Sequence, residues 1–335
     1  MKNRLERFLE EIKKIQGGLP SDLHVTRKAG ALVAISGGKV IHVGKPTVKY
    51  CPLFKALFGT TEADKASIRQ KFNKQFDMWG MFTCNRTVAE DKIIVPFGAS
   101  EIMMYALKRK VAGCAVLVCE GAGTVVTSNP VLVQGIGAYM NGVFYTSPVQ
   151  GIIEKIHKEE GSILDPGTAK IDQTAGVEKA VSLGYKHIAV TVRGDQDDIP
   201  GKIREIEKEN NVSITILSVC NTGINRKQAE IIRRYCDIAW ACASSNIWEI
   251  AGPAAILQLG MKIPVFVLTE KGIRLISGYS RQEILEKIDP GKKHYITASR
   301  LEPGGVKIDM DRFSVYLYET EKLPLHAADE PRPLQ

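Results

Sequence analysis

The chain has no hydrophobic segment long enough to cross a membrane. Its most apolar region, residues 238–268, is interrupted by Glu249, Lys262 and the Gly252-Pro253 pair, whereas a transmembrane helix needs about 20 consecutive apolar residues. The first residues are charged and lack the apolar core and cleavage site of a secretory signal. These absences predict a cytoplasmic protein without a membrane partner.

The motifs of several common enzyme and metal-binding classes are also missing. No CxxC pair occurs, which excludes the familiar zinc-ribbon, thioredoxin and local ferredoxin patterns. GxSxG, HExxH and GxxxxGK[ST] are absent, so serine hydrolases, zincins and P-loop proteins have no support. Any catalytic or metal site must therefore be assembled by the fold.

The composition that remains is that of an ordinary globular protein with excess positive charge. The 335 residues are 44% hydrophobic and 24% charged, and the net charge is +8. Basic residues alternate with acidic ones in helical segments such as residues 202–209, which indicates solvated helix faces, and nucleic acid is not expected as a partner. The odd number of cysteines, seven, argues against a disulfide framework.

The first 90 residues predict a helix, a hairpin and a second helix. Apolar residues at helical spacing over residues 3–16 predict an amphipathic helix. Residues 31–35 and 39–43 flank a glycine turn, which is typical of a β-hairpin. A further helix is predicted over residues 61–76.

From residue 93 onward, short β-branched runs alternate with helical stretches. This pattern predicts an α/β fold with a mostly parallel, doubly wound, Rossmann-like sheet. The predicted strands are residues 93–95, 115–119, 143–146, 162–164, 187–192, 212–220, 238–242 and 263–268. The predicted helices are residues 100–110, 149–159, 174–183, 200–210, 226–235 and 248–259.

The same patterns suggest a division of the chain. The expected parts are residues 1–90 as an N-terminal region, 91–160 and 161–290 as two α/β units, 291–322 as a small antiparallel appendage, and 323–335 as a flexible tail. The boundary near residue 161 rests on a turn-rich segment, and the sheet could continue across it. The proline-rich end is typical of a loose terminus.

Three of the predicted strands end in a cysteine, namely Cys119, Cys220 and Cys242. In open α/β sheets, ligands bind beyond the carboxyl ends of the strands, where the βα loops converge. The shared position therefore indicates a common functional site. Cys51 and Cys84 follow short extended segments and precede turn-forming residues, so they are candidates for the same rim.

Thiolates at such a rim have two chemical uses. Several convergent thiolates suit zinc or an iron–sulfur cluster, which are the expected cofactors. The candidate metal ligands are Cys51, Cys84, Cys119, Cys220 and Cys242. The alternative is a single nucleophilic or redox thiolate, with Cys119 as the catalytic thiol and Glu120 as a proton carrier. Cys114, at a strand start, and Cys236, at a helix end, are expected to be core residues.

The loop after Cys119 resembles part of a dinucleotide-binding turn. Gly121 and Gly123 would let a phosphate approach the backbone, but Val126 occupies the third glycine position and Thr124 looks like extended chain. The candidate phosphate contacts are Gly121, Gly123, Thr124, Ser100, Asn221 and Thr222. These residues are explained more simply as helix caps and turn residues, and phosphate binding stays open as the alternative.

Five segments together carry a family likeness. They read KYCPLF at residues 49–54, FGASEI at 97–102, CEGAGTVV at 119–126, NPVLVQGIG at 129–137 and CNTG at 220–223. Together they resemble the methanogenesis marker protein 8 family, over roughly residues 30–320. The resemblance implies an archaeal cytoplasmic protein whose presence tracks methanogenesis, and it carries no catalytic residues over.

These observations lead to one main functional hypothesis and two alternatives. The main hypothesis is a cysteine-lined crevice that binds a metal or iron–sulfur centre and assists maturation of a methanogenic enzyme or cofactor, whose machinery would be the partner. The first alternative is a small-molecule enzyme that binds a phosphate-containing ligand at Gly121–Gly123 and uses Cys119 or Glu120. The second is a non-catalytic assembly or regulatory factor.

Overall fold

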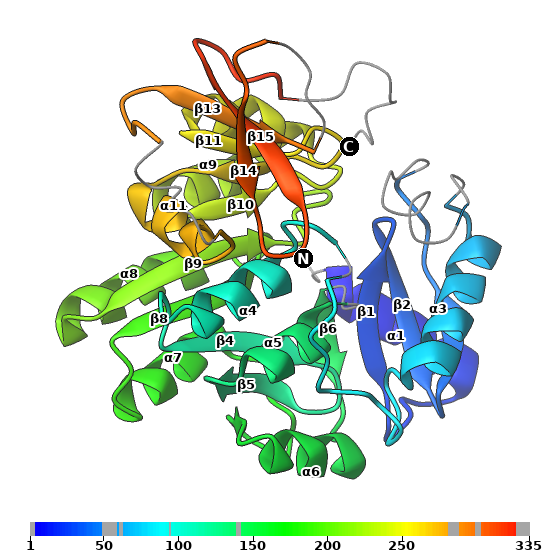
Figure 1. Cartoon of the computed structure of the whole chain (residues 1–335). Helices are drawn as coiled ribbons and strands as arrows, with labels where there is room; N and C mark the ends of the chain where they lie inside the picture. Colours follow the sequence, from blue (N-terminus) through cyan, green and yellow to red (C-terminus); the bar gives the residue numbers. More distant parts are fainter. Residues whose placement is uncertain are drawn as a thin grey trace.

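In the part of the chain that the structure describes, helices pack on two β-sheets (Figure 1). The computed structural model describes residues 4–48, 59, 63–93, 95–138, 142–280, 288–298 and 303–325. Within these ranges, an 11-stranded mixed sheet forms the body and a four-stranded antiparallel sheet lies beside it. The α/β class predicted from the sequence is confirmed.

The small sheet has the strand order β3-β2-β1-β6. Its strands are β1 (His24–Lys28), β2 (Ala31–Ser36), β3 (Lys39–Val43) and β6 (Val143–Thr146), and two helices, α1 (Arg4–Gln16) and α3 (Lys65–Trp79), pack on it. Because neighbouring side chains of a strand point to opposite faces, Val33 packs with α3 and Ala34 with α1. The predicted first helix and hairpin are confirmed. The second helix begins at Lys65, where Asp64 forms the N-cap.

The large sheet has the order β14-β15-β13-β11-β12-β10-β9-β8-β4-β5-β7. Its strands are β4 (Cys114–Cys119), β5 (Gly123–Thr127), β7 (Ser162–Ile163), β8 (His187–Arg193), β9 (Ser213–Val219), β10 (Ile238–Trp240), β11 (Leu257–Leu259), β12 (Val265–Val267), β13 (Lys293–Thr297), β14 (Val306–Asp309) and β15 (Ser314–Thr320). The sheet is continuous across residue 161, because β7 pairs with β5 and β8 with β4.

The expectation of a mostly parallel sheet is not confirmed. Six neighbouring pairs of the described strands are antiparallel, and four are parallel. The parallel core is β4-β8-β9-β10. Antiparallel pairs arise where connections are too short for a crossover, which needs a dozen or so residues. Only residues 120–122 connect β4 to β5, so these strands form a hairpin.

Helices cover both faces of the large sheet. They are α4 (Ala99–Lys108), α5 (Pro130–Gly137), α6 (Gln150–Lys158) and α11 (Glu270–Ser277) on one face, and α7 (Gln173–Ser182), α8 (Ile199–Asn210), α9 (Arg226–Tyr235) and the π-helix η1 (Ile247–Ala251) on the other, with the short α10 (Gly252–Ala254) after η1. Strand residues alternate between the two cores, as Val116 and Leu117 of β4 do.

One predicted helix, residues 248–259, is wrong in its second half. Pro253 provides no backbone N–H to continue the helix, and Ala255 is already extended. The following residues form the buried strand β11 between β12 and β13. In the part of the chain that is described, no helix is both long and apolar enough to cross a membrane.

Candidate functional site

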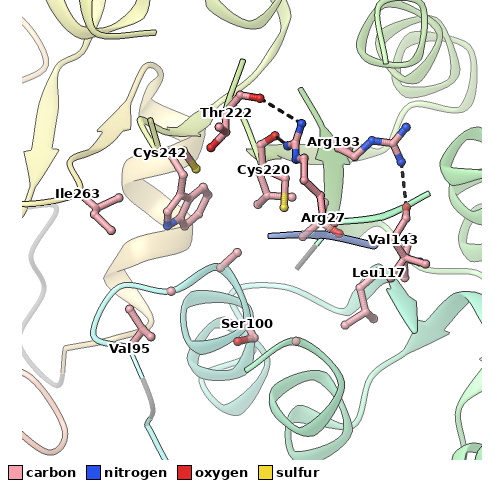
Figure 2. Close-up of a pocket in the computed structure, with 18 of the residues that line it drawn as sticks. Arg27, Val95, Ser100, Leu117, Val143, Arg193, Cys220, Thr222, Cys242 and Ile263 are labelled. Atoms are coloured by element: carbon pink, nitrogen blue, oxygen red, sulfur yellow. Dashed lines mark hydrogen bonds between the residues drawn. The ribbon is translucent and has the colours of Figure 1, made fainter. Parts of the chain in front are cut away.

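A cavity of about 360 Å³ lies where the carboxyl ends of β4, β8, β9 and β10 meet the small sheet (Figure 2). Val118, Arg193, Val219 and Trp240 line it from these strand ends. The turn between β1 and β2 and the first residues of α4 line it as well. This is the edge at which ligands bind in open α/β sheets, and the volume suits a small molecule.

Two arginines, one from each sheet, reach this cavity. Arg27 of β1 donates from Nη1 to the carbonyl of Thr222 at 3.0 Å, and from Nη2 to the carbonyl of Cys220. Arg193 of β8 donates from Nη1 to the carbonyl of Val143 at 2.9 Å (Figure 2). Both guanidinium groups lie near the Phe144 ring, 5.5 and 3.9 Å from its centroid. The arginines therefore hold the two sheets together at one end of the cavity, here termed its mouth.

Positive charge exceeds negative charge at this mouth. Asp195 pairs with Arg193 at 2.5 Å. No carboxylate of the described residues pairs with Arg27, which is 7% exposed. Nearby, Arg4 donates to the carbonyl of Gly30, and its pKa is lowered by burial and by the charge of Arg27. The mouth thus favours an anion.

Glu101 is the acidic side chain in the cavity wall. It is almost fully buried, and its carboxylate accepts hydrogen bonds from the Val95 N–H, the Gln134 amide and the Ser100 hydroxyl. Three donors compensate a buried carboxylate. Glu101 therefore fixes the start of α4 beside the cavity, and Ser100 lines the cavity as well.

The structure brings two of the three strand-end cysteines together. Cys220 and Cys242 both line the cavity, and both adopt a left-handed backbone, with φ of 57° and 48°. Such values are uncommon outside glycine and cost free energy. Cys119 is fully buried elsewhere, with its Sγ 3.3 Å from the carbonyl of Glu120. Burial and the Glu120 charge raise the pKa of Cys119 well above its usual value.

The remaining cysteines do not line the cavity, as far as the structure describes them. Cys84 is exposed and lies against Gly151 of α6, while Cys51 is outside the described residues. Cys114 and Cys236 are buried in the core, as expected, and burial raises the pKa of Cys114 to about 12. Within the described ranges, no group of three or more His, Cys, Asp or Glu side chains is placed to hold a metal ion.

Glu120, the predicted proton carrier, forms a buried ion pair. Its Oε1 accepts from Arg86 Nε at 2.6 Å, and both side chains are 0% exposed. Arg86 also donates to the carbonyls of Gly135 and Ile136 in α5. The pair joins the β4–β5 turn to α5 and does not line the cavity.

The glycine loop is a packed hairpin turn. Gly121 has φ of 75°, and its N–H donates to Thr146 Oγ1 at 2.7 Å. A Cβ on Gly123 would lie 2.3 Å from the carbonyl oxygen of Ala169, and Thr124 donates to Gln173 at 2.9 Å. These residues are buried and do not line the cavity.

Of the two remaining phosphate candidates, Thr222 and Asn221, one lines the cavity and the other does not. Thr222 lines the cavity. Asn221 is buried, and its amide donates to the carbonyls of Ser218 and Trp240, at 3.0 and 2.7 Å. Asn221 therefore fixes the loop after β9 to β10, and so positions Cys220.

Neither arginine was predicted from the sequence as a site residue. Arg193 follows directly after the predicted strand 187–192, so the strand-end rule that selected the cysteines would have selected it too. Arg27 lies in a different sheet, 193 residues from Cys220 in sequence. No local pattern indicated that Arg27 and Cys220 are in contact.

Comparisons with known proteins give the family of the chain. Residues 24–280 match a family described as "Uncharacterized protein conserved in archaea (DUF2099)". The chain belongs to this family. The uncharacterized protein MJ0054 of Methanocaldococcus jannaschii is 41% identical over 268 residues, which cover 80% of this chain and 93% of that protein. No solved structure matches the chain. All cavity-lining residues fall within the DUF2099 match, and the link to methanogenesis stays a prediction.

Proposed function

We propose that the protein binds an anionic small molecule in the cavity between its two sheets. The observation that carries this proposal is that Arg27 and Arg193 line a largely apolar cavity at the carboxyl ends of parallel strands. A guanidinium has five N–H donors. The contacts among the described residues use two on each arginine. The remaining donors suit a carboxylate or a phosphate.

The walls indicate the rest of the ligand. Leu117, Val118, Val219 and Val265 line the cavity with aliphatic groups, and Trp240 adds an aromatic ring. The Trp240 indole N–H already donates to the carbonyl of Phe97 at 3.1 Å, so the ring offers the ligand apolar surface. We therefore expect a ligand with an anionic end at the arginines and an apolar body against these walls.

The experiment compares charged and neutral aromatic probes, with benzoate and benzamide as the pair of matched shape. Phenyl phosphate and benzoate are expected to bind, measured by thermal shift and isothermal titration, whereas benzyl alcohol and benzamide are not. Arg193→Gln should weaken binding of the anions by about tenfold or more, since a hydrogen bond to a charged group contributes about 1.5–3 kcal/mol. Arg233→Gln is the control, because Arg233 is an exposed arginine of α9 with a carboxylate partner.

Two results would contradict the proposal. One is equal binding of neutral and anionic probes. The other is an unchanged affinity in Arg193→Gln. Binding should also weaken as salt increases, because ions screen the attraction between the ligand and the arginines.

A metal centre is the second candidate, and the shared cavity of Cys220 and Cys242 favours it. Two thiolates are half of a tetrahedral ligand set. A metal would therefore need further ligands, either from a molecule bound together with it or from other residues. Maturation of a methanogenic enzyme or cofactor is the role that the family resemblance suggests for such a centre. Anaerobic purification with analysis of iron, zinc, nickel and sulfide tests it, and a metal-free protein whose stability no metal changes would contradict it.

A further inference from the structure

We propose that Cys220 is the nucleophile of the cavity and forms a covalent bond with an electrophilic carbon of the anionic ligand. The inference rests on the proposed function for the charge of the ligand. It adds a reactive atom to what is otherwise only a binding site. Three observations support this inference: the position of the Cys220 sulfur, the fixed backbone around it, and the arrangement of the two arginines.

The thiol of Cys220 lies next to the cationic mouth. A Cβ built on Gly142 would be 3.1 Å from Arg193 Cδ and 3.2 Å from Cys220 Sγ, so both side chains approach the same glycine. Figure 2 shows the Cys220 sulfur directed into the cavity, on the side of Arg27. An anionic group held by the arginines would therefore place the adjoining carbon of the ligand near this sulfur.

The main chain holds this residue in place. Cys220 comes directly after β9, its carbonyl accepts from Arg27, and the amide of Asn221 ties the loop to β10. A nucleophile at the end of a strand, fixed by hydrogen bonds of its neighbours, reacts without first reorganising its loop.

The other strand-end cysteines are worse placed. Cys119 is sealed in the core beside a carboxylate. Cys242 lies on the Ile263 side of the cavity, away from Arg27 and Arg193 (Figure 2). An electrophile oriented by the arginines would thus meet Cys220 first.

The chemical step is a displacement at carbon. The Cys220 thiol gives its proton to water, and the thiolate sulfur forms a bond with the electrophilic carbon. The bond from that carbon to the leaving group breaks, and the leaving group departs with the electron pair. No oxidant or metal is needed for this step.

Alkylation of the reduced full-length protein tests the assignment. Iodoacetate carries a carboxylate and iodoacetamide is its neutral analogue. In the reaction just described, the thiolate displaces iodide from either reagent. Peptide mass spectrometry gives the rate at each cysteine. The exposed Cys84 is the reference for the preference between the two reagents, although Lys155 donates to its carbonyl at 2.8 Å and gives it some positive charge of its own. Relative to Cys84, Cys220 should favour iodoacetate by at least about tenfold, the low end of what a focusing charged cleft achieves. Arg193→Gln should lower this preference, and Cys220→Ser should remove the adduct.

The outcomes separate the two proposals. Failure of both reagents to label Cys220 while they label Cys84 would overturn the inference, as would labelling of Cys242 in its place. Labelling of Cys220 by both reagents with the same preference as Cys84 would retain an accessible cavity thiol, but it would overturn the anion-binding function and with it the oriented reaction. Preferential carboxymethylation of Cys220 that depends on Arg193 supports both.

Discussion

Removal of the Glu120 side chain should destabilise the protein strongly, although Glu120 was a candidate catalytic residue. Its carboxylate is 2.6 Å from Arg86 Nε, and both side chains are 0% exposed. Glu120→Ala would leave a guanidinium buried without its counter-charge, and loss of one partner of a buried ion pair costs about 3–5 kcal/mol. Arg86 would keep backbone carbonyls as acceptors. We therefore expect a loss near the lower end, about 3 kcal/mol.

Urea unfolding followed by circular dichroism measures this loss. The matched control is Glu230→Ala in α9, because Glu230 also pairs with an arginine, Arg233, at 2.9 Å, but both side chains are about half exposed. An exposed pair contributes roughly 0–1 kcal/mol. A loss in Glu120→Ala no greater than in the control would refute the reasoning. Glu120→Gln should also bind phenyl phosphate like the unchanged protein, since Glu120 does not line the cavity.

Two further predictions concern pH and packing. Burial lowers the pKa of His24 to about 4 from its ordinary 6.5. Between these pH values the unfolded chain therefore binds a proton that the folded chain excludes. As pH falls from 6.5 to 4, up to about 3 kcal/mol of stability should be lost. His24→Gln should flatten the unfolding free energy over this window, and an unchanged slope would contradict the assignment. Gly135→Ala would bring a Cβ to 2.0 Å from the Val88 carbonyl oxygen and should cost about 1–3 kcal/mol. Gly201→Ala in α8, which meets no atom within 4 Å, should instead stabilise by up to about 1 kcal/mol, and the two midpoints in urea test the contrast.

Local sequence patterns predicted elements well where the local signal and the final packing agree. The helix over residues 3–16 has a single apolar face, and α1 buries Phe8 and Ile12 from it. The strand ending in Cys220 was recognised because β-branched residues fill β9. The pattern failed at β11, where Leu257–Leu259 continue an apolar stretch that looks helical. Their strand conformation is set by pairing with β12 and β13.

The sequence predicted only part of the candidate site. The strand-end rule selected Cys220 and Cys242, which do line one cavity. It also selected Cys119, although the extended chain from Thr124 onward already indicated that β4 is followed by another strand and not by a helix. Arg27 could not be predicted as a site residue, for a different reason. Its role depends on the docking of one sheet against the other, and that docking is decided by contacts between residues far apart in the chain.

The small sheet can be completed only after β6 has been synthesised. Residues 143–146 pair with β1 and complete the small sheet, although more than a hundred residues separate the two strands in sequence. Until the ribosome has released β6, β1 presents an unpaired edge, which is a template for aggregation. A fragment that stops near residue 90 would expose the same edge permanently. Truncated versions intended to isolate the amino-terminal region should therefore extend through β6 or supply that strand as a peptide.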